Sequence, residues 1–252
     1  MKKNFLQLNI STFSFVDIVN RIIELAVSNS SSYVCVANVH MTIEAHNDRG
    51  YAEIVNKADL ATSDGMPLVW ALRLLYGIKQ ERVAGMDLLP ELLNAAEAED
   101  MVVYFYGGTE EMMRQTERFV KIHYPQLKNV SFESPPFRPL SIQEEEECID
   151  RINASGANLV LVVLGCPKQE KWMACMKGKI NACMVGIGGA LPVLVGMQKR
   201  APEWMQNAGL EWLFRLMQEP QRLFKRYFVT NSLFILLLTR QCLEIKLFRK
   251  QK

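Results

Sequence analysis

Asp64 lies where the sequence could place a reactive carboxylate at the end of a strand. It belongs to the segment 63–67 (SDGMP), which follows the apolar run 58–62 and precedes another apolar stretch. An open α/β sheet carries its chemistry where a strand passes through a Gly-Pro turn into a helix. A carboxylate held there can act as a general base while one side stays open to substrate. The alternative interpretation is that Asp64 caps the helix that follows.

Other polar side chains follow, or lie between, the predicted strands. Asn38 and Gln169 are amides that could hydrogen-bond a sugar or a uracil ring. Arg82 could bind a phosphate or hold a carboxylate. Its alternative role is a surface ion pair with Asp87 or Glu81.

Glycine-rich turns follow two further predicted strands. Gly107 and Gly108 close one of them, and Gly188 lies in the turn 186–189 that closes another. Such turns let backbone amides approach a phosphate at a helix N-terminus, so we count these three glycines as candidate substrate contacts. Neither turn matches G-x-G-x-x-G, and the sequence has no Walker motif, which disfavours a dehydrogenase or an NTPase.

The sequence offers no recognisable metal site. It contains no D-x-D motif, and among its three histidines His40 and His46 are six residues apart, which is off one helix face. Sugar transfer from a nucleoside diphosphate needs its leaving group neutralised, commonly by a divalent ion. We therefore expect neither a metal nor another cofactor, and in an enzyme of that kind arginines would have to supply the positive charge.

Three arginines near the C-terminus are candidates for that role. Arg215, Arg222 and Arg226 are spaced by seven and four residues, which would align them on one helical face. Pro220 lies between them and could break this phase. The alternative is a basic helix attracted to anionic lipid, and both roles could coexist.

Alternating strand-like and helix-like segments must position these residues. Apolar runs rich in Val and Ile predict strands at 33–39, 58–62, 101–106, 159–164 and 182–187, with a short sixth at 130–132. Helical patterns lie at 41–56, 67–76, 88–99, 110–123, 142–153 and 169–177. This order predicts a Rossmann-like α/β fold with a mainly parallel sheet flanked by helices.

The C-terminal part of the chain differs in charge. Residues 199–252 hold 11 Lys and Arg against 4 acids, a net charge of +7, while the first 198 residues carry −5. We predict an α/β catalytic domain at 1–196 and a helical, basic appendage at 197–252, with a helical region from 201 to 216 and a second helix opened by Pro220. A basic appendage after an acidic body indicates an anionic partner.

Residues 227–239 are almost entirely apolar. This run is too short to span a bilayer, and the basic residues on both sides favour an interfacial helix on an anionic membrane surface. The alternative is a helix packed on the core or in an oligomer interface, so oligomeric state stays open. Base-stacking aromatics interleaved with basic residues are missing, and we expect no nucleic-acid partner.

Cysteine usage and the N-terminus bear on the cellular compartment. The six cysteines form no CxxC pair, which favours reduced thiols in a cytosolic protein. No continuous apolar segment follows the first residues, so we expect no signal peptide.

Taken together and in order, several short motifs resemble those of the WecG/TagA/CpsF glycosyltransferase family over roughly residues 30–230. The segments that carry the resemblance are 37–38 (AN), 63–67 (SDGMP), 82–87 (RVAGMD), 106–108 (YGG), 134–137 (SPPF), 165–170 (GCPKQE), 186–189 (GIGG), 200–202 (RAP) and 209–212 (GLEW), followed by Arg215, 219–220 (EP) and Arg222.

The resemblance implies inverting, metal-independent transfer from a UDP-sugar to a polyprenyl-diphosphate-linked sugar, at the cytoplasmic face of the bacterial cell membrane. By matching position, Asp64 is similar to the family's general base. Asn38, Arg82 and Gln169 resemble its donor and acceptor contacts, and the C-terminal arginines resemble those of a mobile appendage that engages the diphosphate.

One position departs from the family pattern. Some relatives carry a hydroxyl residue two positions before the Asn, where this chain has Val36. The donor sugar therefore stays open between an N-acetylmannosamine type and a related hexose or uronic acid. The functional alternative from another class is a non-catalytic nucleotide-sugar- or lipid-binding peripheral membrane protein, which the behaviour of an Asp64 variant would distinguish.

Overall fold

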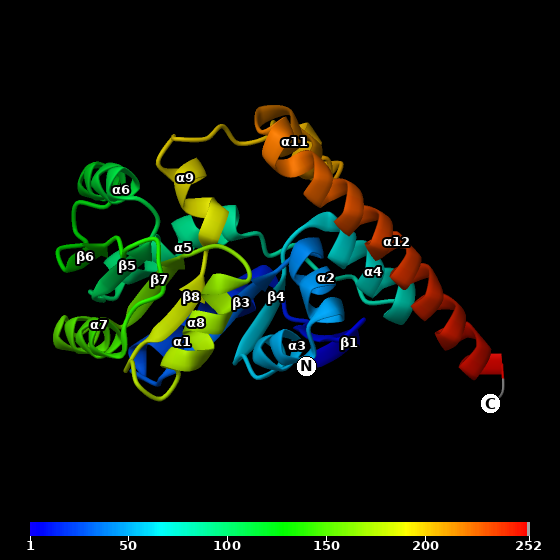
Figure 1. Cartoon of the computed structure of the whole chain (residues 1–252), viewed down its shortest axis with the longest axis horizontal. Helices are drawn as coiled ribbons and strands as arrows, with labels where there is room; N and C mark the ends of the chain where they lie inside the picture. Colours follow the sequence, from blue (N-terminus) through cyan, green and yellow to red (C-terminus); the bar gives the residue numbers. More distant parts are fainter. Residues whose placement is uncertain (251–252) are drawn as a thin grey trace.

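A six-stranded parallel sheet forms the centre of the molecule in the computed structural model, which describes the backbone of residues 1–250 and side chains up to residue 245. The strand order is β4-β3-β8-β7-β5-β6, with every neighbouring pair parallel (Figure 1). The strands are β3 (Ser32–Ala37), β4 (Leu60–Ser63), β5 (Val103–Gly107), β6 (Val130–Glu133), β7 (Leu159–Val163) and β8 (Cys183–Gly186). The predicted Rossmann-like fold class is confirmed.

Helices cover both faces of this sheet. One face packs against α1 (Phe15–Val27), α5 (Gly85–Ala98) and α6 (Glu110–His123). The other packs against α2 (Val39–Asn47), α3 (Arg49–Asn56), α7 (Ile142–Ala154) and α8 (Lys168–Met176). Because both faces are covered, the strands bury nearly all of their side chains, as continuous apolar runs predict.

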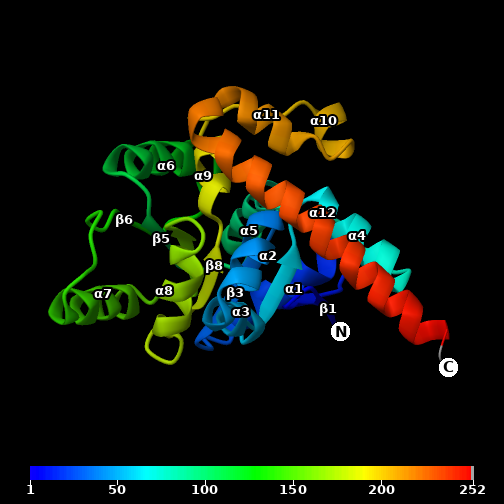
Figure 2. The ribbon, with the colours of Figure 1, turned by 45° about the vertical axis from the view of Figure 1, so that its right-hand side comes forward.

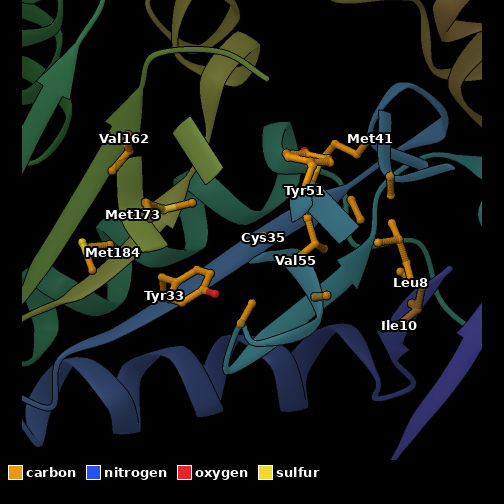
Figure 3. Close-up of a cluster of buried hydrophobic side chains, with 14 of the residues drawn as sticks. Leu8, Ile10, Tyr33, Cys35, Met41, Tyr51, Val55, Val162, Met173 and Met184 are labelled. Atoms are coloured by element: carbon orange, nitrogen blue, oxygen red, sulfur yellow. The ribbon is translucent and has the colours of Figure 1, made fainter. Parts of the chain in front are cut away.

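Successive residues of a strand supply two separate cores. In β3, Tyr33 and Cys35 enter one apolar cluster, and Val34 and Val36 enter the other. This is the period-two alternation of a pleated strand. Figure 3 shows the first cluster, where Tyr33 and Cys35 lie among side chains from α2, α3, α8 and neighbouring strands. These two cores fix the strands whose ends carry the polar residues.

Some elements were not anticipated. A two-stranded antiparallel ribbon, β1 (Lys2–Phe5) and β2 (Leu8–Ser11), lies beside the β4 edge, where the Ser11 hydroxyl accepts a hydrogen bond from the Ala61 N–H at 3.2 Å. The predicted helix 41–56 is instead two helices, because Asp48 caps α3 by accepting from the Tyr51 N–H at 3.1 Å.

Within residues 197–250, the segment predicted as a C-terminal appendage contains three helices after a short connection. A 3₁₀ turn η1 (Gly188–Ala190) and α9 (Leu191–Leu194) precede α10 (Glu203–Asn207), α11 (Glu211–Gln218) and α12 (Pro220–Lys250). The helical region predicted from 201 to 216 breaks at Gly209, which adopts φ +70°. Pro220 begins α12, as predicted. Residues 251 and 252 of the predicted appendage lie outside the described residues.

Helix α12 runs across the molecule from α11 past α2 and α4 (Met66–Tyr76) (Figure 1). The Phe234 ring packs on Phe5 with ring centroids 5.7 Å apart, so part of the apolar run 227–239 is packed on the body. The helix extends this run in both directions. By length and composition alone, its segment Pro220–Ile245 is long and apolar enough to cross a membrane, so the length argument made for residues 227–239 does not extend to the whole helix.

The topology opens a crevice at one edge of the sheet. The chain leaves β3 into α2 on one face, and it leaves the adjacent β8 into η1 and α9 on the opposite face. In open α/β sheets, ligands bind in such a crevice, beyond the carboxyl ends of the strands.

Candidate active site

A cavity of about 700 Å³ lies at the carboxyl edge of the sheet. The segments that follow β3, β4, β7 and β8 form its floor, and residues of α11 and α12 close it from above. Figure 2 shows these two helices passing over that edge of the sheet. A neighbouring cavity of about 390 Å³ shares several lining residues with the first.

Asp64 lies in the larger cavity, directly after β4. Its backbone N–H donates to the Ala37 carbonyl at 2.7 Å, which fixes the turn. Gly65 occupies the N-cap of α4, and no side chain caps this helix, so the capping interpretation of Asp64 is wrong. Within residues 1–245, the Asp64 carboxylate has neither a hydrogen-bond partner nor an ion-pair partner. It is therefore free to meet a ligand.

The surroundings of Asp64 favour a carboxyl group that can take up a proton. Burial, reinforced by the negative charges of Glu211 and Asp87, raises the pKa of Asp64 to about 7, against the opposing effect of Arg215 and Arg82. A group with this pKa exists in both protonation states near neutral pH. That is the property required of a general base.

Two amides border the cavity with opposite hydrogen-bonding groups available. The Asn38 Oδ1 caps α2 by accepting from the Met41 N–H at 3.1 Å, which leaves the Asn38 amino group uncommitted. The Gln169 Nε2 donates to the Glu170 carboxylate at 2.8 Å, and the Gln169 Oε1 is buried with no partner in the part of the chain whose side chains are described. A ligand could therefore accept from Asn38 and donate to Gln169.

The candidate glycines have different positions. Gly188 lines both cavities, and a Cβ there would lie 3.0 Å from the Gln169 Oε1, so the glycine leaves room for this amide. Gly108 lines only the smaller cavity. Gly107 lines neither; a Cβ there would lie 2.6 Å from the Val163 carbonyl group, so its lack of a side chain lets β5 and β7 approach each other.

Arg82 lines the cavity but its guanidinium group is already paired. It contacts the Asp87 carboxylate at 2.9 Å and the Glu211 carboxylate at 3.1 Å. The ion pair with Asp87 that the sequence allowed is present, and the alternative partner Glu81 instead accepts from the Phe15 N–H at 2.7 Å.

The three C-terminal arginines come together although they belong to two helices. Arg215 of α11 and Arg222 and Arg226 of α12 all line both cavities. Arg215 donates to the Gly189 carbonyl at 3.2 Å. Arg222 pairs with Glu219, whereas the Nε of Arg226 is buried without a partner among residues 1–245. Because helix α12 begins anew at Pro220, their proximity comes from packing, and a single helical face does not explain it.

Two cavity residues were not singled out as site residues from the sequence. Glu211 entered only as part of a motif, and its Oε1 is buried without a partner. His40 lines the cavity near Arg226. Its pKa is lowered mainly by burial and secondly by the positive charge of Arg226. The position of His40 two residues after Asn38, at a strand end, was the available signal.

The sequence model of a protein family described as "Glycosyl transferase WecG/TagA/CpsF family" matches residues 3–247, nearly the whole chain. The chain belongs to this family. It is therefore a glycosyltransferase of cell-envelope polysaccharide synthesis, an activity that requires a sugar donor and an acceptor. The resemblance inferred from short motifs is confirmed and extends beyond residues 30–230.

Proposed function

We propose that this glycosyltransferase moves a sugar from a UDP-sugar to a polyprenyl-diphosphate-linked acceptor by an inverting single displacement. The observation that carries the proposal is the unpaired Asp64 carboxylate, which faces the cavity and has a pKa of about 7. A lone base of this kind is suited to deprotonating an alcohol.

The reaction would proceed in one step. The acceptor hydroxyl attacks the anomeric carbon of the donor and passes its proton to Asp64, while the bond from that carbon to the UDP oxygen breaks. Attack opposite the leaving group inverts the anomeric configuration. No second carboxylate is required, because no covalent glycosyl-enzyme forms.

Arginine side chains are proposed to neutralise the departing diphosphate. Arg215, Arg222 and Arg226 line the cavity that holds Asp64, and Arg226 has a buried Nε free of protein partners. Within residues 1–245, no group of three His, Cys, Asp or Glu side chains is arranged to hold a metal ion. Guanidinium groups placed where negative charge develops can perform the electrostatic part of catalysis.

Asn38 and Gln169 are proposed to orient the substrates. Their available amino and carbonyl groups could bind a sugar substituent or the uracil ring. Gly188 borders this cavity and the smaller neighbouring one, Gly108 borders the smaller one, and both glycines allow a close approach of the backbone.

Helix α12 is proposed to hold the enzyme on the cytoplasmic surface of an anionic membrane. Its inner side, including Leu223, Thr230 and Phe234, is buried against the body, while Phe228 is 67% exposed and Leu236 is 65% exposed. Because one side is packed on the protein, an orientation along the surface is favoured over a span. The 1–196 and 197–252 units would then be a catalytic body and a membrane-facing appendage.

A UDP-release screen tests this function. The full-length protein is incubated with a panel of UDP-sugars and a short-chain polyprenyl-diphosphate sugar, and UDP formation is followed with and without acceptor. We expect acceptor-dependent release with at least one donor. An Asp64→Asn variant should still bind that donor but lose turnover by at least ~10². Normal turnover by this variant would refute the assigned base.

A further inference from the structure

Helix α11 carries two polar side chains that contact opposite sides of the cavity. The Glu211 Oε2 lies 3.1 Å from the Arg82 Nη1, and Arg215 donates to the Gly189 carbonyl at 3.2 Å. A spacing of four residues places Glu211 and Arg215 on the same side of the helix. The pairing of Glu211 therefore bears directly on where Arg215 lies.

The partner of Glu211 is held in place by other groups of the protein. The second Nη of Arg82 pairs with Asp87 at 2.9 Å and lies 3.5 Å from the Gln206 Oε1 of α10. Asp87 pairs in turn with Arg200. The charges thus alternate from Arg200 through Asp87 and Arg82 to Glu211, and this chain of ion pairs joins the catalytic body to the appendage.

The ion pair between Arg82 and Glu211 is shielded from solvent. The two side chains are 16% and 18% exposed, and solvent screens such a pair less than it screens a surface pair. Helix α11 itself has no fully buried residue and only eight residues, so apolar packing alone holds it weakly. The ion pair with Glu211 is then a direct charged contact between α11 and the body.

One carboxylate oxygen of Glu211 lies in an environment that destabilises the fold. Its second carboxylate oxygen, Oε1, is buried without a partner, and an unsatisfied buried acceptor destabilises a fold. A glutamine would keep much of the shape without the charge. The presence of a carboxylate at this position is explained if its charge is needed to engage Arg82.

We propose that Glu211 is a positioning residue that docks α11 through Arg82 before substrate binds, and so places Arg215 in the cavity that holds Asp64. This inference rests on the proposed function only for the role of Arg215 at the diphosphate. Arg82 then acts on catalysis through the appendage, because its guanidinium group is already engaged by carboxylates on two elements.

A double-mutant cycle of Arg82→Gln, Glu211→Gln and the combined variant tests this docking. Amide hydrogen exchange of residues 212–218 is measured on the full-length protein without substrate, with the amides of β3 and β4 as a reference for an intact fold. We expect each single change to speed exchange in α11 by about 10-fold, and the combined change to add little more, because contacting charges couple strongly.

The matched control is the exposed ion pair between Glu117 and Lys121 of α6, whose atoms are 2.7 Å apart. Changing both of its residues to Gln should leave exchange in α11 unchanged. If Glu211→Gln disturbs the β3 and β4 reference, Glu211→Asp replaces it, since it keeps the charge but shortens the reach to Arg82. Faster exchange of α11 in this variant is again the expected result.

Catalytic measurements separate docking from a direct electrostatic effect. Glu211 raises the pKa of Asp64, whereas Arg82 lowers it. If the two residues acted only through Asp64, the two single variants would shift the pH profile in opposite directions and leave α11 exchange unchanged. Docking predicts the same change in exchange in both, together with a fall in kcat of about 10-fold.

Unchanged exchange in both single variants, or additive effects in the double variant, would overturn the proposal. A wild-type protein that turns over no UDP-sugar would instead refute the proposed function, and the exchange experiment would still decide whether the ion pair docks α11.

Discussion

The protonation of Asp64 gives the sharpest prediction for the reaction. With a pKa of about 7, roughly a tenth of the protein carries the carboxylate at pH 6, half at pH 7 and nine-tenths at pH 8. Because the acceptor proton can pass only to the ionised form, kcat/KM should rise about tenfold from pH 5 to pH 6 and level off above pH 8. An ordinary aspartate would show no such rise in this range.

The variant Asp64→Asn removes the titrating group while keeping its size. We expect kcat/KM to fall by at least ~10² at pH 8, and the rise between pH 5 and pH 8 to disappear. UDP release is measured over pH 5–9 at fixed ionic strength. Asp17→Asn is the matched control, because Asp17 is exposed in the first turn of α1 and lies outside the cavity; its profile should match the wild type.

His40 is another titrating group of the cavity that could make kcat/KM rise with pH in this range. Its pKa is lowered from the usual histidine value by burial and by Arg226, so its ionisation lies below that of Asp64. The rise should therefore persist in His40→Gln. A flat wild-type profile, or a rise retained in Asp64→Asn and lost in His40→Gln, would refute the assignment of Asp64 as base.

Three further predictions follow from the same structure. Because folding raises the pKa of Asp64, the contribution of its protonated form to stability is complete below pH ~4 and is lost as the pH rises to about 7. At pH 8 the wild type must bury a charged carboxylate that Asp64→Asn lacks, so the variant should raise the melting temperature more at pH 8 than at pH 5. Arg215→Gln and Arg226→Gln should each lower kcat by about 10- to 100-fold. EDTA should leave wild-type turnover unchanged, and strong inhibition by EDTA would contradict neutralisation of the diphosphate by arginines. Changing the exposed residues Phe228 and Leu236 to Ser should reduce co-sedimentation with anionic vesicles without altering the melting temperature, and equal vesicle binding by these variants would contradict the membrane role of α12. By contrast, Phe234→Ala should lower the unfolding free energy by about 3 kcal/mol, because it leaves a cavity against Phe5.

The sheet was predictable because its strands are buried on both faces. The strands lie in apolar runs, such as the one that contains Val34 and Cys35, and most of these runs end at glycine, asparagine or aspartate. This pattern is typical of parallel strands covered on both faces. The same reasoning missed the break between α2 and α3, where the pattern of apolar residues continues and only the cap at Asp48 interrupts the helix. A single side-chain hydrogen bond decided that boundary.

Residues at strand ends were found in the sequence because topology brings such ends together. Asn38, Asp64, Gln169 and Gly188 all border one cavity, as expected for the carboxyl edge of a parallel sheet. Gly107 shows the limit of this reasoning. A glycine at a strand end serves close strand packing as readily as ligand binding, and only the position of Val163 distinguishes the two.

Glu211 and the three arginines show why the appendage could not be placed from sequence spacing. Helix α11 ends at Gln218 and α12 begins at Pro220, so no single helical periodicity connects Arg215 with Arg226. Packing of α11 and α12 over the sheet brings them to Asp64, where one acid of the appendage raises the pKa of this residue and one arginine lowers it. Since the appendage supplies charges of both signs, undocking would change both the affinity for a diphosphate and the proton affinity of the base. We therefore expect catalysis and docking to be coupled through the same few side chains.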